Sequence, residues 1–242
     1  EAAAQALAGH TLKAERNFKQ AKLNDLPEVQ YWKAYNFGRM ERWDDAAEMM
    51  PDDPVFLSRY PRLIKYELGL VLAETALRQN NIQVAGDYIA LLQSDLSKMK
   101  NPYLSAYRYL LGELRRQEGD ESEALAIWEE MLESGDRLYR AKAGLAWVKL
   151  ARIQEEITPA RGIEILDQLR YTWRGDGLET QIAHTLGKMY MEQGEYRKGL
   201  SLLRETASFT DNEANRSDIV SDMQTAFRDL FLGDASENLS AI

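Results

Sequence analysis

One spacing of small, turn-forming and bulky residues recurs along this chain and constrains its fold more than any other feature. A small residue is followed seven positions later by a turn glycine, then after five more by a second small residue and after four more by a bulky one. Two antiparallel helices approach closely only where a side chain is tiny, and a glycine between them ends the first helix. The spacing therefore predicts helix hairpins. Its two clearest copies are Gly187, Gly194, Gly199 and Leu203, and Gly112, Gly119, Ala124 and Trp128.

The first small residue of this pattern recurs along the whole chain, at intervals of 34 to 41 residues. This pattern resembles that of the tetratricopeptide repeat (TPR) family, whose period is about 34 residues. The resemblance implies an all-α fold, a right-handed α-α superhelix (solenoid) of about six helix hairpins. The positions are Ala2, Gly38, Ala73, Gly112, Ala146, Gly187 and Ala226.

Two of these repeats depart from the regular spacing. After Gly38 the turn at Arg42 and Trp43 comes early and predicts a short second helix, and after Ala146 the turn is stretched as far as Pro159. No long linker divides the chain, so we expect a single TPR-like domain over residues 1–242. Because the pattern is interrupted at both ends, we expect incomplete terminal repeats and a fragment of a longer repeat protein.

The segment from Asp218 to Leu232 is predicted to be the last complete first helix, and it carries an apolar face. The end of a solenoid is normally capped by polar residues. An apolar face here therefore predicts a missing neighbour, or end-to-end association of two copies. The residues of this face are Val220, Met223, Phe227, Leu230 and Phe231.

The composition excludes several classes of protein. With 39 acidic against 30 basic residues and a formal charge of −9, the chain lacks the basic surface that nucleic-acid binding needs. No apolar run reaches the roughly 18 residues that a membrane span requires, so we expect this part to be soluble. The sequence does not choose between periplasm and cytoplasm; the absence of cysteine slightly favours the periplasm.

The sequence offers little for catalysis. Only two histidines occur, His10 and His184, and neither has a second histidine at metal-ligand spacing. The loop at Arg174–Gly177 is explained by a capping Asp176 rather than by phosphate binding. We therefore expect no enzyme activity, no metal and no cofactor.

The resemblance implies that the first helices line a concave face. The positions three before, one after and four after each small residue should then be exposed and bind a protein segment, with Trp147 as an exposed tryptophan. The set mixes aromatic residues with both charge signs, which suits a protein partner. These residues are Tyr35, Arg39, Arg42, Glu74, Tyr109, Glu113, Arg116, Trp147, His184 and Lys188.

Alternatives remain open at this point. Tyr109, Glu113 and Arg116 equally fit an ordinary helix face with pairs three and four residues apart. The carboxylate clamp of some TPR proteins is not reproduced, because its positions here are Trp32, Asn36, Glu67, Ala106 and Arg140. Two functions follow. One is a non-catalytic scaffold that binds a protein segment in the groove; the other, by analogy with bacterial motility or secretion apparatus, is a structural spacer of an envelope assembly that contacts its neighbours through edges and ends.

Overall fold

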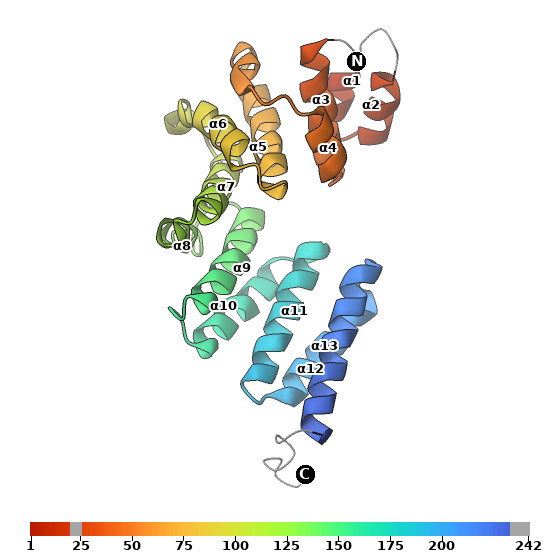
Figure 1. The fold of residues 1–242 in the computed structure, drawn as a ribbon, viewed down its shortest axis with the longest axis vertical. Coiled ribbons are helices and arrows are strands. Elements are labelled where there is room, and N and C mark those ends of the chain that lie inside the picture. Colours follow the sequence, from red (N-terminus) through yellow and green to blue (C-terminus); the bar gives the residue numbers. More distant parts are fainter. Residues whose placement is uncertain (20–25, 233–242) are drawn as a thin grey trace. The chain divides into compact units, whose positions relative to one another are not determined.

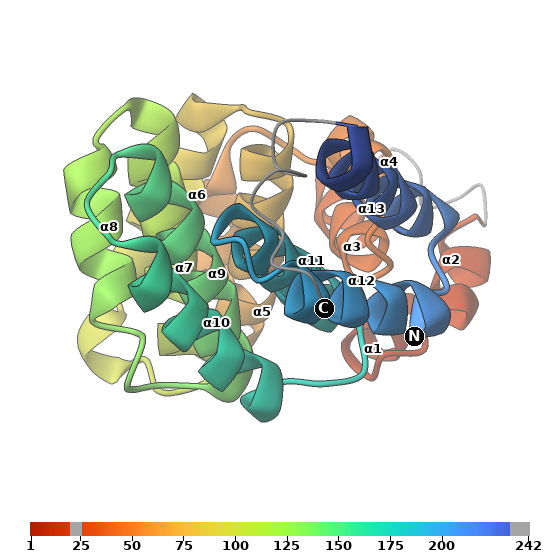
Figure 2. The same cartoon turned by 90° about the horizontal axis from the view of Figure 1, so that it is seen from below.

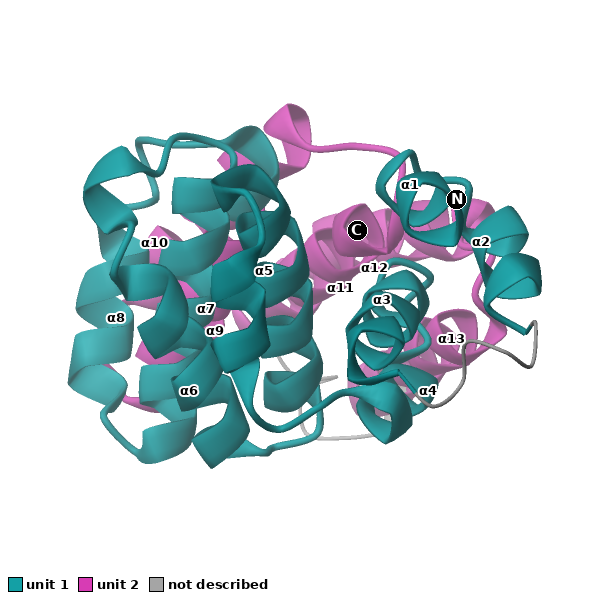
Figure 3. Ribbon diagram, turned by 90° about the horizontal axis from the view of Figure 1, so that it is seen from above, with its two compact units in different colours: residues 1–139 teal, residues 140–242 magenta. Residues whose placement is uncertain are grey.

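The computed structural model describes residues 1–19 and 26–232, with side chains described as far as Leu230, and this part of the chain is helical without strands (Figure 1). It separates into two compact units, residues 1–139 and 140–242 (Figure 3). The boundary falls in the first turn of α9 (Arg137–Ile153), where the sequence shows no linker. The single domain expected over residues 1–242 stays a prediction.

Unit 1 consists of consecutive helix hairpins. In each pair, α1 with α2, α3 with α4, α5 with α6 and α7 with α8, the two helices pack together, and the first helices α3, α5 and α7 also pack on one another in order (Figures 1 and 2). This serial packing is that of a helical repeat. The helices are α1 (Ala2–Leu7), α2 (Thr11–Phe18), α3 (Pro27–Gly38), α4 (Trp43–Met49), α5 (Arg62–Arg78), α6 (Ile82–Gln93), α7 (Tyr103–Glu118) and α8 (Glu121–Glu129), with short 3-10 helices η2 (Pro54–Arg59) and η3 (Leu96–Lys98).

Unit 2 contains most of α9, followed by α10 (Pro159–Thr172), α11 (Gly177–Glu192), α12 (Tyr196–Phe209) and α13 (Glu213–Leu232). Helix α11 packs against α10, α12 and α13. A Cβ on Gly162 would lie 3.3 Å from Val148 Cγ1, which shows that α10 lies against α9. The loop before α11 is closed as expected, because the side chain of Asp176 accepts hydrogen bonds from the first backbone amides of the helix.

The predicted close approaches are present in the two clearest hairpins. A Cβ on Gly112 would lie 2.8 Å from Trp128 Cδ1, and one on Gly187 would lie 2.5 Å from Leu203 Cδ2. The bulky residue of the pattern thus fills the space opposite the first glycine. Gly38 differs, since its Cβ would meet Val71 of the next hairpin at 2.5 Å.

The two irregular repeats lie where the spacing predicted them. Helix α4 is short, and the turn between α9 and α10 occupies residues 154–158. The register in α9 was wrong, however. Ala146 is only half-buried, whereas Ala143 and Gly144 are buried. Because most sides of this helix are buried, the positions of small residues alone do not identify the side that faces the partner helix.

The last helix differs from its prediction in two respects. It begins at Glu213, five residues before the expected Asp218, because the Asn212 side chain accepts a hydrogen bond from Asn215 N at 3.0 Å and caps the helix earlier. On its apolar face, Val220 (38%) and Phe227 (57%) are exposed and Met223 is half-buried, but Leu230 is buried at 6%. The side chain of Phe231 lies outside the described residues. None of the described helices is both long and apolar enough to span a bilayer.

Candidate functional site

The first helices of unit 1 share a continuous polar and aromatic surface, which we call the unit 1 face. At its centre is Glu67 on α5. Its carboxylate accepts hydrogen bonds from the hydroxyl of Tyr35 on α3 (3.2 Å) and the hydroxyl of Tyr103 on α7 (2.8 Å). Arg39 Nη1 lies 3.9 Å from the same carboxylate. One side chain therefore connects three consecutive first helices.

The face continues along α5 and α7. Arg78 Nη2 lies 3.3 Å from Glu74 Oε1 on α5, and Arg116 donates two hydrogen bonds to Glu113 on α7, at 2.6 and 3.0 Å. These pairs lie three or four residues apart, as the helix-face alternative predicted. Tyr109 lies between them and packs against the rings of Trp128 (6.4 Å between centroids) and Tyr139 (6.2 Å).

The electrostatics of the face keep its hydroxyls protonated. Burial, followed by the hydrogen bond and the charge of Glu67, raises the pKa of Tyr103 from 10.0 to about 12. Burial is also the largest cause of the raised pKa values of Tyr35, Tyr109 and Tyr139. At neutral pH these phenols therefore act as hydrogen-bond donors.

In each ion pair of the face, the cation is more exposed than the anion. The arginine side chains of the three pairs are 46%, 51% and 41% exposed, against 29%, 15% and 21% for their glutamates. The glutamates are therefore more recessed than the arginine side chains, and the Arg78 guanidinium lies over the ring of Trp43, 5.1 Å from its centroid. A ligand approaching this face would first meet N–H donors and positive charge, although the chain as a whole is acidic.

Three of the residues expected on the concave surface are buried or lie elsewhere, and four more, Glu74, Tyr109, Glu113 and His184, are half-buried rather than exposed. Tyr35 is 1% exposed, because its ring packs between α3 and its neighbours while only the hydroxyl reaches Glu67. Trp147 is 8% exposed, because α9 is buried on most sides, so the expected exposed tryptophan was wrong. Arg42 lies beyond the end of α3 and binds Asp45 at 2.7 Å and Glu15 at 3.3 Å, away from the unit 1 face.

Two of the three predicted residues of unit 2, His184 and Lys188, meet at a carboxylate on α13. Asp222 Oδ2 lies 2.7 Å from His184 Nε2 and 3.2 Å from Lys188 Nζ. Burial raises the pKa of Asp222, but the hydrogen bonds from His184 and Lys188 outweigh it, and the net pKa is lowered. Nearby, burial and the charge of Lys188 lower the pKa of Lys149 on α9. This cluster carries more cationic than anionic groups.

The sequence reasoning missed the groups that organise both clusters. Glu67 was considered only as a clamp position, and Tyr103, Tyr139 and Asp222 were not singled out. Glu67 lies seven residues before Glu74 on α5, a spacing that places both on one helix face and could have indicated it. No comparable signal pointed to Tyr139, because it lies outside the regular spacing.

These surfaces offer a partner hydrogen-bond donors and acceptors, charged groups and aromatic rings. Within residues 1–19 and 26–232, no group of three or more His, Cys, Asp or Glu side chains is placed to hold a metal ion. Whether the predicted residues bind a partner stays a prediction.

Comparison with known proteins adds the fold. No protein-family model and no curated protein matches the chain. A solved structure does: the apo form of RapI, a TPR-like helical repeat protein, superimposes with a TM-score of 0.59 over 96% of this chain and 67% of RapI, at 13% sequence identity. At this identity the likeness concerns the fold alone, and it shows that the chain has the fold of a helical repeat protein.

Proposed function

We propose that this chain is a non-catalytic protein–protein interaction scaffold, a right-handed superhelix of about six hairpins whose first helices bind a segment of a partner protein. The observation that carries the proposal is the unit 1 face, where Glu67 and its two tyrosine donors connect α3, α5 and α7. A surface held in place by such contacts loses little conformational entropy when it binds. The likeness to a TPR-like repeat protein supports this function.

The exposure of the ion pairs suggests the character of the partner segment. Because Arg39, Arg78 and Arg116 are more exposed than their glutamates, the segment that fits best carries carboxylates and meets the guanidinium groups. The half-buried rings of Tyr103 and Tyr109 supply apolar contact area.

The experiment has two stages. The full chain first captures partners from its native organism, and the affinity of the identified partner is then measured for the triple variant Arg39→Gln, Arg78→Gln, Arg116→Gln. Three partly exposed charge contacts should together account for about a tenfold loss of affinity or more. A matched control replaces Arg16, Arg59 and Arg108, which are exposed on the same unit, by Gln. Equal affinity of both triple variants would place the partner elsewhere.

A second candidate function is a structural spacer in a large bacterial envelope assembly, which contacts its neighbours through edges and ends. The observation that favours it is the exposure of Val220 and Phe227 on α13. If this end is a contact surface, the pair Val220→Ser and Phe227→Ser should abolish concentration-dependent self-association in sedimentation experiments. A chain that is monomeric at all concentrations would count against end-to-end association.

A further inference from the structure

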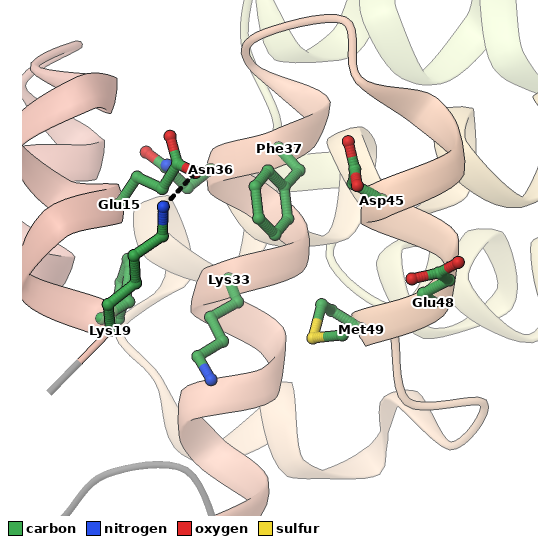
Figure 4. Close-up of a pocket in the computed structure, with 9 residues that line it drawn as sticks. Glu15, Lys19, Lys33, Asn36, Phe37, Asp45, Glu48 and Met49 are labelled. Atoms are coloured by element: carbon green, nitrogen blue, oxygen red, sulfur yellow. Dashed lines mark ion pairs between the residues drawn. The ribbon is translucent and has the colours of Figure 1, made fainter. Parts of the chain in front are cut away.

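An open pocket of about 270 Å³ lies in unit 1 among α2, α3 and α4 (Figure 4). Two of its walls belong to second helices, so it is separate from the unit 1 face, which is built from first helices. Charged and apolar side chains alternate around it. Its lining residues are Glu15, Phe18, Lys19, Lys33, Asn36, Phe37, Asp45, Glu48 and Met49.

Asn36 on α3 is the most unusual residue of the pocket, because it is 1% exposed and only half of its amide is satisfied. Its Nδ2 donates to the carbonyl of Thr11 at 3.1 Å. This contact fixes the orientation of the amide, since only the nitrogen can donate to a carbonyl. No described group donates to Oδ1. Buried acceptors in folded proteins nearly always have a donor, so this atom indicates a ligand that supplies one.

A carboxylate lies next to this amide. Thr11 and Glu15 are one helical turn apart on α2 and therefore share the side of the helix that faces Asn36. Glu15 binds Lys19 Nζ at 3.2 Å and Arg42 Nη1 at 3.3 Å. Burial raises its pKa, but the two cations outweigh burial and the net pKa is lowered, so the carboxylate is ionised at neutral pH. An amide oxygen and a carboxylate thus lie together, where a cation with several N–H groups fits.

The rest of the pocket suits an apolar stem. Phe18 is 5% exposed, and Phe37 and Met49 are half-buried. The guanidinium of Arg42 covers one face of the Phe37 ring, with its central carbon 4.5 Å from the ring centroid. Phe37 also lines the pocket. Glu48 on α4 adds an exposed carboxylate on the wall opposite Asn36 (Figure 4).

We propose that this pocket binds the side chain of one arginine residue of a partner protein. The guanidinium donates to Asn36 Oδ1 and to the carboxylate of Glu15, the charge of Glu48 on the opposite wall adds to the attraction, and the methylene stem packs against the apolar wall. Arginine fits better than lysine because its planar head carries five N–H donors in fixed directions. The incoming head replaces Lys19, whose side chain is 73% exposed, as a partner of Glu15.

The test is a titration of the full chain, with ¹³C-labelled methionine methyl groups, by Nα-acetyl-arginine amide. The Met49 methyl resonance should shift and saturate, while that of Met131, buried elsewhere in unit 1, should not move. Nα-acetyl-citrulline amide has nearly the same shape without the charge and should bind several-fold more weakly. Equal shifts with the two probes, or no saturable shift with either, would overturn the proposal.

Two variants locate the binding within the pocket. Glu48→Gln removes one exposed charge and should weaken the affinity for the arginine probe by about two- to fivefold. Asn36→Leu removes the buried acceptor and should weaken the affinity for the probe by about tenfold or more, provided that the variant keeps the helical circular dichroism spectrum of the wild type. Glu129→Gln, an exposed acid at the end of α8, is the matched control. Unchanged affinity in Glu48→Gln would contradict the assignment whether or not Asn36→Leu folds.

Discussion

The α7/α8 hairpin of unit 1 and the α11/α12 hairpin of unit 2 share one residue spacing, yet different atoms close the space between their helices. In unit 1, Gly112 faces the fully buried indole of Trp128, whose Nε1 donates to the carbonyl of Tyr109 at 3.1 Å. In unit 2, Leu203 lies opposite Gly187 in the same way, but the second small residue is Gly199 where unit 1 has Ala124, and a Cβ on Gly199 would lie 2.7 Å from the carbonyl oxygen of Gly187. The spacing thus specifies where two helices meet closely, but the identities of the second small residue and the bulky residue decide which atoms are in contact.

The polar faces of the two units differ in a related way. In unit 1, the Glu67 carboxylate is held by the hydroxyls of Tyr35 and Tyr103, which titrate only in strong alkali. In unit 2, Asp222 is shared by His184 and Lys188. The two clusters should therefore respond to opposite ends of the pH scale.

The largest effect is expected from substitutions in the two interhelix seams, the close contacts at Gly112 in unit 1 and at Gly199 in unit 2. Gly112→Ala and Gly199→Ala should each lower the free energy of unfolding by about 1–3 kcal/mol, because the added Cβ has no space. The two variants should differ in how far a second substitution restores their stability. Trp128→Leu removes the side chain that blocks Gly112→Ala, so this pair should show a favourable coupling of about 1 kcal/mol or more. For Gly199→Ala the Cβ would meet Met191 Cγ at 2.5 Å and also the carbonyl oxygen of Gly187 at 2.7 Å, so Met191→Ala removes only one of the two obstacles and should rescue less. Urea denaturation followed by far-ultraviolet circular dichroism gives both double-mutant cycles.

Gly86 provides the control for these cycles. It lies inside α6, and a Cβ there would meet nothing within 4 Å. Gly86→Ala should therefore stabilise the chain by about 0.5–1 kcal/mol through helix propensity. If Gly112→Ala proved equally harmless, the indole would not be in close contact with α7, and the described seam would be wrong.

The seams also show how much of the fold could be predicted. The spacing of Gly112 with Trp128 and of Gly187 with Leu203 depends on local helix geometry, and both contacts are present. The short α4 and the stretched turn before α10 followed from turn residues alone. The register in α9 could not be obtained in this way. Several small residues occur there in succession, so the spacing did not decide which of them is buried, and Trp147 was misplaced as a consequence.

The candidate site was less predictable, because its organising contacts join residues far apart in the sequence. Tyr35, Glu67 and Tyr103 belong to three different helices, and only their packing brings the two hydroxyls to one carboxylate. Counting from the small residues located Arg39 and Glu74 but could not tell a side chain that protrudes from one that is buried. Asn36 shows the same limit, since its unsatisfied oxygen is a property of the packed structure.

A smaller effect is expected at the unit 1 face. Tyr103→Phe removes one hydrogen bond to Glu67 and should cost about 1 kcal/mol of unfolding free energy at pH 8. The pKa of Tyr103 is raised in the folded state, from 10.0 to about 12. Its contribution is therefore complete below pH 10 and is lost as the pH rises from 10 to 12. The difference between wild type and variant, measured by urea denaturation, should shrink over that range.

Tyr171→Phe is the matched control, because Tyr171 is 65% exposed and lies in unit 2. Its substitution should leave the alkaline curve of the wild type unchanged. A Tyr103→Phe difference that stays constant from pH 8 to 12 would mean that the hydroxyl does not stabilise the folded chain through Glu67.

The smallest effect is expected in unit 2, at the opposite end of the pH scale. His184 and Lys188 lower the folded pKa of Asp222 below its ordinary 3.8 despite burial, so its contribution is present above that value and is lost as the pH falls through the folded pKa. Because Asp222 is 30% exposed, Asp222→Asn should cost only about 0.5–1 kcal/mol at neutral pH. The difference from wild type should disappear in acid, whereas that of Tyr103→Phe should disappear in alkali. Asp211→Asn, an exposed residue of the same unit, should show neither change. A difference that persisted at low pH would show that Asp222 acts through packing rather than through its charge, and the contrast between the two units would then concern shape alone.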